Sequence, residues 1–305
     1  MSVYYERKPI LVRTQKRLNA EIFESTMGYK LDYSNPRTFN EKLNWLKFNW
    51  RDTLVTKCSA KDTVREYVVD TLGKNSGKYL TSLVGEGVYF RAEDVDFESL
   101  PNQFALKANN GSGTNIICSD KSKLDIKQTK ETLSQWLNPK NNYFYHKFEW
   151  GYKNIKPAIV CEEYLGDWGA VRDYKIFCFN GEPRFIYVSN EFDSRKKHID
   201  MDYLTLDWKP TGYTRKAYKP PKEIFKKPTS LDEMINVAKK LSGPFPFVRV
   251  DFFEVKGTPK VAEMTFYPSG GTGAFENIEH DYEIGFMLSL PKAKNRARVF
   301  ERTSK

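Results

Sequence analysis

The stretch that decides the fold runs from residue 247 to residue 265 and reads FVRVDFFEVKGTPKVAEMT. Two runs rich in β-branched and aromatic residues, 247–255 and 260–265, flank a Lys-Gly-Thr segment. Strand-forming runs separated by three residues that contain glycine are typical of a β-hairpin. The sequence therefore predicts a hairpin whose turn has three residues and is centred on Gly257.

This turn fixes which side chains face each other. It places Asp251 opposite Glu263 and Arg249 opposite Thr265, and alternation along the strands puts all four on one face. Two carboxylates directly opposite each other repel and weaken a hairpin. A hard divalent cation such as Mg²⁺ would remove that cost and commonly binds phosphates as well. The alternative is a surface hairpin whose charges face water.

Composition limits the class of protein. The chain has 305 residues, of which 40% are hydrophobic and 15% aromatic, enough for a large core in one domain or several lobes. No run of 18 apolar residues predicts a membrane helix, and the first nine residues do not resemble a signal peptide. The widely spaced cysteines form no C-x-x-C pair, so we expect neither a zinc site nor a thioredoxin-like motif, and a reducing cytoplasm. These cysteines are Cys58, Cys118, Cys161 and Cys178.

The charge predicts an anionic partner. The formal net charge is +10, and lysine and arginine crowd residues 13–17, 209–227 and 292–305. A nucleotide, an acidic polysaccharide, a nucleic acid or a membrane surface would each suit such a surface. For the C-terminal tail alone, solubility is sufficient explanation.

The remaining chain mixes helical and strand patterns. Residues 9–50 read as largely helical, with capping boxes at Thr38–Glu41 and later at Ser230–Glu233. Asn180-Gly181 is the turn of a second hairpin over residues 174–188. We also expect helices over 59–72, 126–137 and 230–241, strands near 79–89, 103–108, 116–118 and 157–161, and a long loop over 209–228.

A glycine-rich loop follows the strand that ends at Ala108. Gly111 and Gly113 would let backbone N–H groups approach a phosphate, and Lys107 could place its ammonium there. The spacing matches neither the P-loop nor the dinucleotide-binding fingerprint. A simple hairpin turn therefore remains an equal alternative.

Two further segments carry charge on apolar strands. Lys175 lies in Asp173-Tyr-Lys-Ile-Phe177. It is either a buried cation that needs an anion or a solvent-side residue, and strand statistics favour the solvent side. Glu162 and Glu163 form a doubled carboxylate at a strand end, either a hinge or an exposed acidic end.

The residue inventory favours phosphoryl chemistry. Three dispersed histidines and the absence of a G-x-S-x-G elbow argue against a hydrolase triad. Lysines, an arginine, glycines and carboxylates suit reactions in which positioning and charge neutralisation supply most of the catalysis.

Taken in order, these segments resemble the ATP-grasp superfamily, and more narrowly its TupA-like family, named from teichuronopeptide biosynthesis. The resemblance covers approximately residues 30–275, and it is the ordered set of segments that is specific. It is carried by Asn35-Pro-Arg-Thr-Phe-Asn-Glu-Lys42, Lys61, Val64-Arg-Glu-Tyr-Val68, Phe104-Ala-Leu-Lys107, Asn110-Gly-Ser-Gly113, Ile159-Val-Cys-Glu-Glu-Tyr-Leu165, Asp173-Tyr-Lys175, Arg249-Val-Asp251 and Glu263-Met-Thr-Phe-Tyr-Pro268.

The resemblance implies an α+β ATP-grasp fold in which two α+β lobes enclose the nucleotide behind a helical N-terminal segment. The implied divisions are 1–56 for the helical segment, 57–165 for the first lobe with a preceding α/β part, 166–290 for the second lobe with the metal hairpin, and 291–305 for a basic tail.

It also implies an ATP-dependent carboxylate–amine ligase that forms an amide through an acyl phosphate. The expected substrate is a uronic-acid-containing cell-surface polysaccharide or its precursor, joined to an amino acid or another amine, in the cytoplasm. Peripheral contact with a membrane is left open, and no nucleic acid is expected. The alternatives are a sugar or polysaccharide kinase and a non-enzymatic binder of anionic polymer.

The resemblance assigns a role to each matching residue. Lys61 and Lys107 would hold the α- and β-phosphates of ATP, and Lys175 would touch the γ-phosphate. Arg249 would steady the acyl phosphate, so Arg249 and Lys175 are the catalytic candidates. Many ATP-grasp enzymes carry asparagine where this chain has Thr265, which leaves two-metal geometry open. The other implied residues are Asn110, Gly111, Ser112, Gly113 and Asp173 at the phosphates, Glu162, Glu163, Tyr164 and Leu165 at the adenine, and Asp251, Glu263 and Thr265 at Mg²⁺.

Overall fold

The computed structural model describes residues 11–166, 172–189 and 200–292. The first residues of the chain and nearly all of the basic tail expected at 291–305 lie outside this description. Within the described ranges, no helix combines the length and the apolar character needed to cross a membrane.

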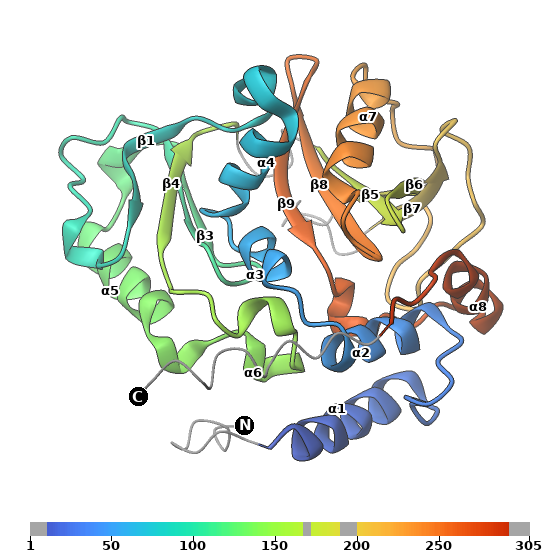
Figure 1. Cartoon of the computed structure of the whole chain (residues 1–305). Coiled ribbons are helices and arrows are strands. Elements are labelled where there is room, and N and C mark those ends of the chain that lie inside the picture. Colours follow the sequence, from blue (N-terminus) through green and yellow to red (C-terminus); the bar gives the residue numbers. More distant parts are fainter. Residues whose placement is uncertain (1–10, 167–171, 190–199, 293–305) are drawn as a thin grey trace.

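Two antiparallel sheets form the framework (Figure 1). The first sheet has the strand order β1-β4-β2-β3, and the second has the order β7-β6-β5-β8-β9. The strands of the first sheet are β1 (Leu83–Tyr89), β2 (Phe104–Ala108), β3 (Asn115–Cys118) and β4 (Ile159–Glu163), and those of the second are β5 (Asp173–Phe179), β6 (Glu182–Ser189), β7 (Met201–Thr205), β8 (Phe247–Val255) and β9 (Thr258–Thr265).

Helices surround and connect these sheets (Figure 1). α5 lies beside the first sheet, α7 beside the second, and α3 and α4 lie between the two in this view. Short 3-10 helices cover Gly73–Tyr79, Ala92–Asp94, Lys121–Lys123, Pro139–Asn141, Trp150–Tyr152 and Pro268–Gly271. The α-helices are α1 (Val12–Met27), α2 (Phe39–Asn49), α3 (Thr53–Ser59), α4 (Val64–Leu72), α5 (Ile126–Leu137), α6 (Phe144–Lys147), α7 (Leu231–Ser242) and α8 (Ile278–Met287).

Strand alternation divides the side chains of each sheet between two faces. In the first sheet, Phe104 and Leu106 point into a core that includes Leu133 of α5. Their neighbours Ala105 and Lys107 must point the opposite way, because successive side chains alternate. In the second sheet, Ile176, Cys178 and Val250 point toward α7, while Lys175, Arg249 and Asp251 share the other face. That face also carries Phe177 and Phe179, which pack against Phe39 of α2.

The hairpin of β8 and β9 forms with the expected register at the site and a different turn. Asp251 pairs with Glu263, and Arg249 pairs with Thr265, as the sequence predicted. The turn, however, has two residues, because Val255 already pairs with Thr258. Lys256 and Gly257 both have positive φ, of 50° and 76°, as a two-residue type I′ turn requires. A bulge between the pairs of Phe252 and Asp251 adds one residue on β9 and restores the predicted register.

Helix starts confirm one capping box and correct the other. Thr38 and Glu41 form the reciprocal bonds of a capping box at the start of α2. Ser230 makes no such cap at α7. Instead, Glu254 of β8 accepts hydrogen bonds from the Ser230 backbone and hydroxyl at 2.8 and 2.9 Å, while Glu233 accepts one from Tyr79 at 2.7 Å. A distant carboxylate therefore replaces the local cap.

Candidate active site

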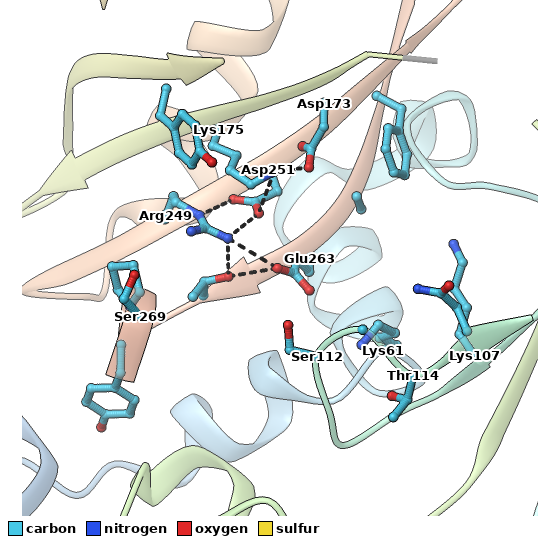
Figure 2. A pocket seen from close by; sticks show the side chains of 18 of the residues that line it. Lys61, Lys107, Ser112, Thr114, Asp173, Lys175, Arg249, Asp251, Glu263 and Ser269 are labelled. Carbon is cyan, nitrogen blue, oxygen red and sulfur yellow. Dashed lines mark hydrogen bonds and ion pairs between the residues drawn. The ribbon is translucent and has the colours of Figure 1, made fainter. Parts of the chain in front are cut away.

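A cavity of about 480 Å³ lies between the polar faces of the two sheets. The first sheet contributes Ala105, Lys107 and Ile117, and the segment after β4 contributes Glu163, Tyr164 and Leu165. Figure 2 shows side chains from both sides converging on this space. The second sheet contributes Asp173, Lys175, Phe177, Tyr187, Tyr203, Arg249, Asp251, Phe253, Glu263 and Thr265.

The hairpin carboxylates are joined by a guanidinium (Figure 2). Arg249 donates to both oxygens of Asp251, at 2.7 and 2.6 Å, and its Nη2 lies 3.3 Å from Glu263 Oε1. Nη2 also donates to the Thr265 hydroxyl at 3.1 Å, and that hydroxyl donates to Glu263 at 3.0 Å. The cation that the opposed carboxylates require is thus partly supplied by the chain itself.

Burial and charge shift the pKa values of this group in different directions. Burial raises the pKa of Asp251 to about 6, although Arg249 and Lys175 oppose the rise. Burial also acts on Glu263, but the charges of Lys61, Arg249 and Lys175 outweigh it and lower its pKa to about 2. Burial opposes the charge of Arg249, yet Asp251 and Glu263 raise its pKa overall. Glu263 is therefore an anion, and Arg249 a cation, over the whole physiological range.

The oxygen ligands of the hairpin suit a Mg²⁺ ion that is also bound by the phosphates of a nucleotide. Asp251, Glu263 and the Thr265 hydroxyl are hard oxygen ligands on one face, and Mg²⁺ typically takes one or two carboxylates together with substrate phosphates. Among the described residues, no group of three or more His, Cys, Asp or Glu side chains is arranged to hold a metal alone. In the same part of the chain, the buried Asp173 Oδ1 has no hydrogen-bond partner.

Lys175 is a buried cation rather than a solvent-side residue. Only 5% of it is exposed, which corrects the expectation from strand statistics. Its ammonium pairs with Asp173, lies 4.0 Å from Asp251 Oδ2, and stands over the Tyr187 ring at 5.4 Å. The register of the sheet explains this, because Lys175 pairs with Asp251 on one side and with Tyr187 on the other.

Lys107 points into the cavity and is held by Glu162. The Glu162 carboxylate lies 2.5 Å from Lys107 Nζ and 3.3 Å from Arg65 Nη1. Glu162 does not itself line the cavity, whereas Glu163, Tyr164 and Leu165 do. Its side chain therefore orients a cation, and the residues that follow it form the wall.

Lys61 anchors the glycine-rich loop through two hydrogen bonds to its backbone. Lys61 Nζ donates to Gly111 O at 2.8 Å, and its backbone N–H donates to Asn109 O at 3.1 Å. The side chain of Asn109 in turn donates to Asp62 and to the backbone of Lys156, at 2.9 and 3.0 Å. Of the loop residues singled out from the sequence, Ser112 and Gly113 line the cavity, and Asn110 and Gly111 do not.

Glu149 is a site residue that sequence reasoning missed. It is 4% exposed and lines the cavity from the segment between α6 and the following 3-10 helix. Burial raises its pKa to about 7, while the charges of Lys47 and Lys147 oppose the rise. Burial also lowers the pKa of Lys47, but Asn19, Asn44 and Gly270 O accept one hydrogen bond each from its Nζ, at 3.0, 2.9 and 2.7 Å. Three acceptors require three protons, so this geometry holds Lys47 as an ammonium.

Glu149 lies in an aromatic stretch over residues 143–152. Phe144 and Phe148 of this stretch pack in a small core with Phe48. The same stretch also presents Tyr143 and Tyr152 to the cavity. A second missed residue, Arg215, comes from the long loop expected over 209–228.

The model of the TupA-like ATP-grasp family matches residues 41–289. No curated protein matches the chain. Among solved structures, D-alanine–D-alanine ligase from Helicobacter pylori has 15% identity and a TM-score of 0.44 over 77% of this chain and 61% of that one.

Two other solved structures show a similar degree of likeness. D-alanine–D-alanine ligase from Bacillus anthracis in complex with ATP has 15% identity and a TM-score of 0.41 over 69% of this chain and 55% of that one. Phosphoribosylamine–glycine ligase from Thermotoga maritima has 12% identity and a TM-score of 0.40 over 70% and 48%. The match thus spans about half to three fifths of the length of these structures.

Proposed function

The chain belongs to the TupA-like ATP-grasp family, and from this premise we propose that it is an ATP-dependent carboxylate–amine ligase. One observation carries the proposal. A single cavity between two sheets collects cations suited to a triphosphate and carboxylates suited to its metal ion. These are Lys61, Lys107, Lys175 and Arg249 on the one hand, and Asp251 and Glu263 on the other.

ATP would lie across both sheets. Backbone groups of residues 163–165, which line the cavity next to Lys107, suit the adenine. Lys107 and Lys61 would meet the α- and β-phosphates beneath the loop residues Ser112 and Gly113. The ion pair with Glu162 supports this role, because it fixes the Lys107 ammonium at the cavity wall.

Mg²⁺ would be held by Asp251 and Glu263, with Thr265 as a further oxygen ligand, and would neutralise charge on the phosphates. The present contacts of Arg249 with Asp251 imply that the guanidinium yields part of that carboxylate when the ion binds. Arg249 would then be free to turn toward the reacting group.

In the first step, a substrate carboxylate oxygen attacks the γ-phosphorus of ATP. The bond from this phosphorus to the bridging oxygen breaks, and ADP leaves with its electron pair. Lys175 pairs with Tyr187 on one neighbouring strand and with Asp251 on the other, and its ammonium would face the transferring phosphoryl group. The planar fork of Arg249 would stabilise the acyl phosphate through paired hydrogen bonds.

In the second step, an amine attacks the acyl carbon, and phosphate leaves. The amine must lose a proton, and a base with a pKa near the working pH is the most effective acceptor. Glu149 is the candidate for this base, since it lines the cavity and burial raises its pKa to about 7. We therefore include Glu149 as the general base of amide formation.

For the carboxylate substrate, we propose a uronic acid on a cell-surface glycan or its precursor. The net charge of +10 suits an anionic substrate. We further propose a reducing cytoplasm as the site of action, and Cys58, Cys118, Cys161 and Cys178 are all buried and free. We keep the division into a first lobe over 57–165 and a second over 166–290 as part of the same proposal.

The test is ADP release with Mg·ATP, screened with amino acids and uronic-acid oligosaccharides singly and in pairs. The expected result is ADP formation that needs a uronic acid, together with an amide product in mass spectra when an amine is present. Hydroxylamine should trap the acyl phosphate as a hydroxamate. A stable phosphoester in place of the amide would make the protein a kinase, and the absence of any nucleotide effect would make it a binder of anionic polymer.

A further inference from the structure

Arg215 lies in the segment between β7 and α7, where it is fixed by pairing with the chain after β9. It forms a bridge with Phe275. On either side, Lys216 N donates to Ala274 O at 3.1 Å, and Glu276 N donates to Thr214 O at 3.0 Å. The backbone of Arg215 is therefore held as firmly as that of a short strand.

The guanidinium of Arg215 is buried and held in place by specific contacts. Only 6% of the residue is exposed. Its Nε donates to the Tyr203 hydroxyl at 2.9 Å, and its Cζ lies 4.6 Å from the centre of the Phe275 ring. Gly273 provides the room, because a Cβ there would lie 1.2 Å from Nη1. The fold thus reserves space for this group at a position where any larger residue would collide with it.

This buried cation has no ion-pair partner in the described part of the chain. No carboxylate there lies within ion-pair distance of Arg215, and its buried Nη1 has no hydrogen-bond partner. Asp281 acts on it only from a distance, since the Asp281 oxygens accept from the backbone and side chain of Asn40 at 3.1 and 2.8 Å. An arginine remains ionised even when buried, and a buried unpaired charge is costly.

Three of the four phosphate-side cations differ from Arg215 in this respect, whereas Lys61 donates to the Gly111 carbonyl. Lys107 pairs with Glu162, Lys175 with Asp173, and Arg249 with Asp251. Arg215 lines the same cavity with one neutral hydroxyl as its hydrogen-bonding partner. The anion that would complete its environment must therefore enter through the cavity.

We propose that Arg215 binds a carboxylate of the substrate, at a subsite distinct from the cations that face the triphosphate. That the anion is a carboxylate rests on the proposed ligase function, whereas the need for an anion rests on the structure alone. The carboxylate could belong to the amine substrate, as the α-carboxylate of an amino acid, or to the acid substrate. Arg215 offers a planar, charged donor that suits either source.

The experiment measures thermal unfolding of the full chain with the ATP analogue AMP-PNP and Mg²⁺ present, so that the triphosphate cations are engaged. L-alanine is compared with L-alaninamide, and D-glucuronate with D-glucose, in wild type, in Arg215→Met and in the exposed control Arg184→Met. A ligand that binds the folded state alone raises Tm by mass action. We expect a carboxylate probe to raise the Tm of wild type and of the control more than its neutral analogue does, and Arg215→Met to lose that difference.

The alanine pair and the glucuronate pair show whether the carboxylate belongs to the amine substrate or to the acid substrate. A difference confined to the alanine pair assigns the carboxylate to the amine substrate, and one confined to the glucuronate pair assigns it to the acid substrate. Without probes, Arg215→Met should unfold at the same or a higher temperature than wild type, because a methionine removes an unpaired buried charge.

Three results would overturn the proposal. These are a carboxylate-dependent shift that survives in Arg215→Met, a shift that is absent from wild type, and a loss of the AMP-PNP shift itself in Arg215→Met, which would make Arg215 a nucleotide ligand. The assay requires no turnover. Failure to form ADP or amide with any substrate would therefore refute the ligase function and leave the anion subsite standing.

Discussion

Asp251 and Glu263 face each other across β8 and β9, and the guanidinium of Arg249 contacts both carboxylates. The side chain of Asp251 is 2% exposed and that of Glu263 36%, so the pair reaches from the protein interior to the cavity. Both carboxylates line the cavity, and Asp251 is the more deeply buried of the two. This asymmetry makes their substitution informative.

Asp251→Asn should lower stability and abolish Mg²⁺-dependent ADP formation. From the sequence alone, relief of carboxylate repulsion would leave the metal-free protein no less stable. The contact with Arg249 reverses that expectation, because the amide leaves a buried guanidinium with less compensation. Denaturant unfolding without metal should show a loss of about 1.5–3 kcal/mol, the range for hydrogen bonds to charged groups.

Glu263→Gln is the matched comparison for Asp251→Asn. The lowered pKa of Glu263 means that its ionised carboxylate stabilises the folded state, whereas the pKa of Asp251 is raised. Glu263→Gln should therefore cost at least as much stability at neutral pH as Asp251→Asn, while ADP formation is lost equally. Equal activity of both variants and wild type would show that the hairpin has a structural role only.

The fold of the hairpin shows what a single sequence can and cannot predict. The positions of Asp251 and Glu263 followed from alternation and from the location of the turn. The turn length was wrong by one residue, and the bulge on β9 compensates for it. A β-bulge changes the register without any marked signal in composition. The predicted pairing of Asp251 with Glu263 was therefore correct only because the shorter turn and the bulge shift the register in opposite directions.

The same limit applies to the rest of the site. Lys107, Lys175 and Arg249 lie on strands, where period-two alternation tells which side chains share a face. Glu149 and Arg215 lie outside regular strands and helices, and they reach the cavity only through tertiary contacts. No local periodicity could have identified them. The aromatic segment that holds Glu149 is what core packing also produces, and the basic segment that holds Arg215 predicted an anionic partner without singling out one residue.

Lys107→Ala should weaken nucleotide binding without unfolding the protein. The change removes a cation from the cavity wall and leaves Glu162 with Arg65 as its remaining ion-pair partner. The increase in Tm produced by Mg·ATP should therefore shrink. Lys127→Ala, an exposed change on α5, is the control. An undiminished increase in Lys107→Ala would remove this residue from the nucleotide site.

The glycine-rich loop should be mobile without ligand and ordered by Mg·ATP. Hydrogen exchange over residues 109–115 reports this directly, and the change should be largest at the exposed Ser112 and Gly113, because Asn109, Asn110 and Gly111 are buried. Lys61→Met should speed exchange near Gly111, since it removes the 2.8 Å bond that holds the loop. Exchange that neither Mg·ATP nor this variant changes would contradict a phosphate-covering role.

Glu149→Gln should change how stability depends on pH. The pKa of Glu149 rises from its ordinary 4.5 to about 7 on folding, so between these values the folded state binds more protons than the unfolded state. The contribution of Glu149 to the free energy of unfolding is then full below pH 4.5 and is lost as pH rises to about 7. The glutamine variant lacks this loss and should exceed wild type above pH 7 by up to about 3 kcal/mol. The control is the exposed Glu131→Gln on α5, which should follow wild type at every pH.

The same variant tests the proposed base through the pH dependence of amide formation. In wild type the amide step should accelerate as pH rises through about 7, because only the ionised carboxylate can accept the proton of the amine. Glu149→Gln should lose that dependence and slow the step by about 10²–10⁴-fold.

Hydroxamate formation should survive in the variant, since hydroxylamine is largely neutral at pH 7 and attacks without a base. Equal loss of hydroxamate and amide would instead show that Glu149 shapes the cavity, as would a wild-type pH profile retained at lower rate. The groups that face Glu149 are Lys47, Lys147, Arg249, Glu263, Tyr143, Tyr152 and Tyr267, and all of them remain in the variant. A selective loss of the amide step would therefore belong to this one carboxylate.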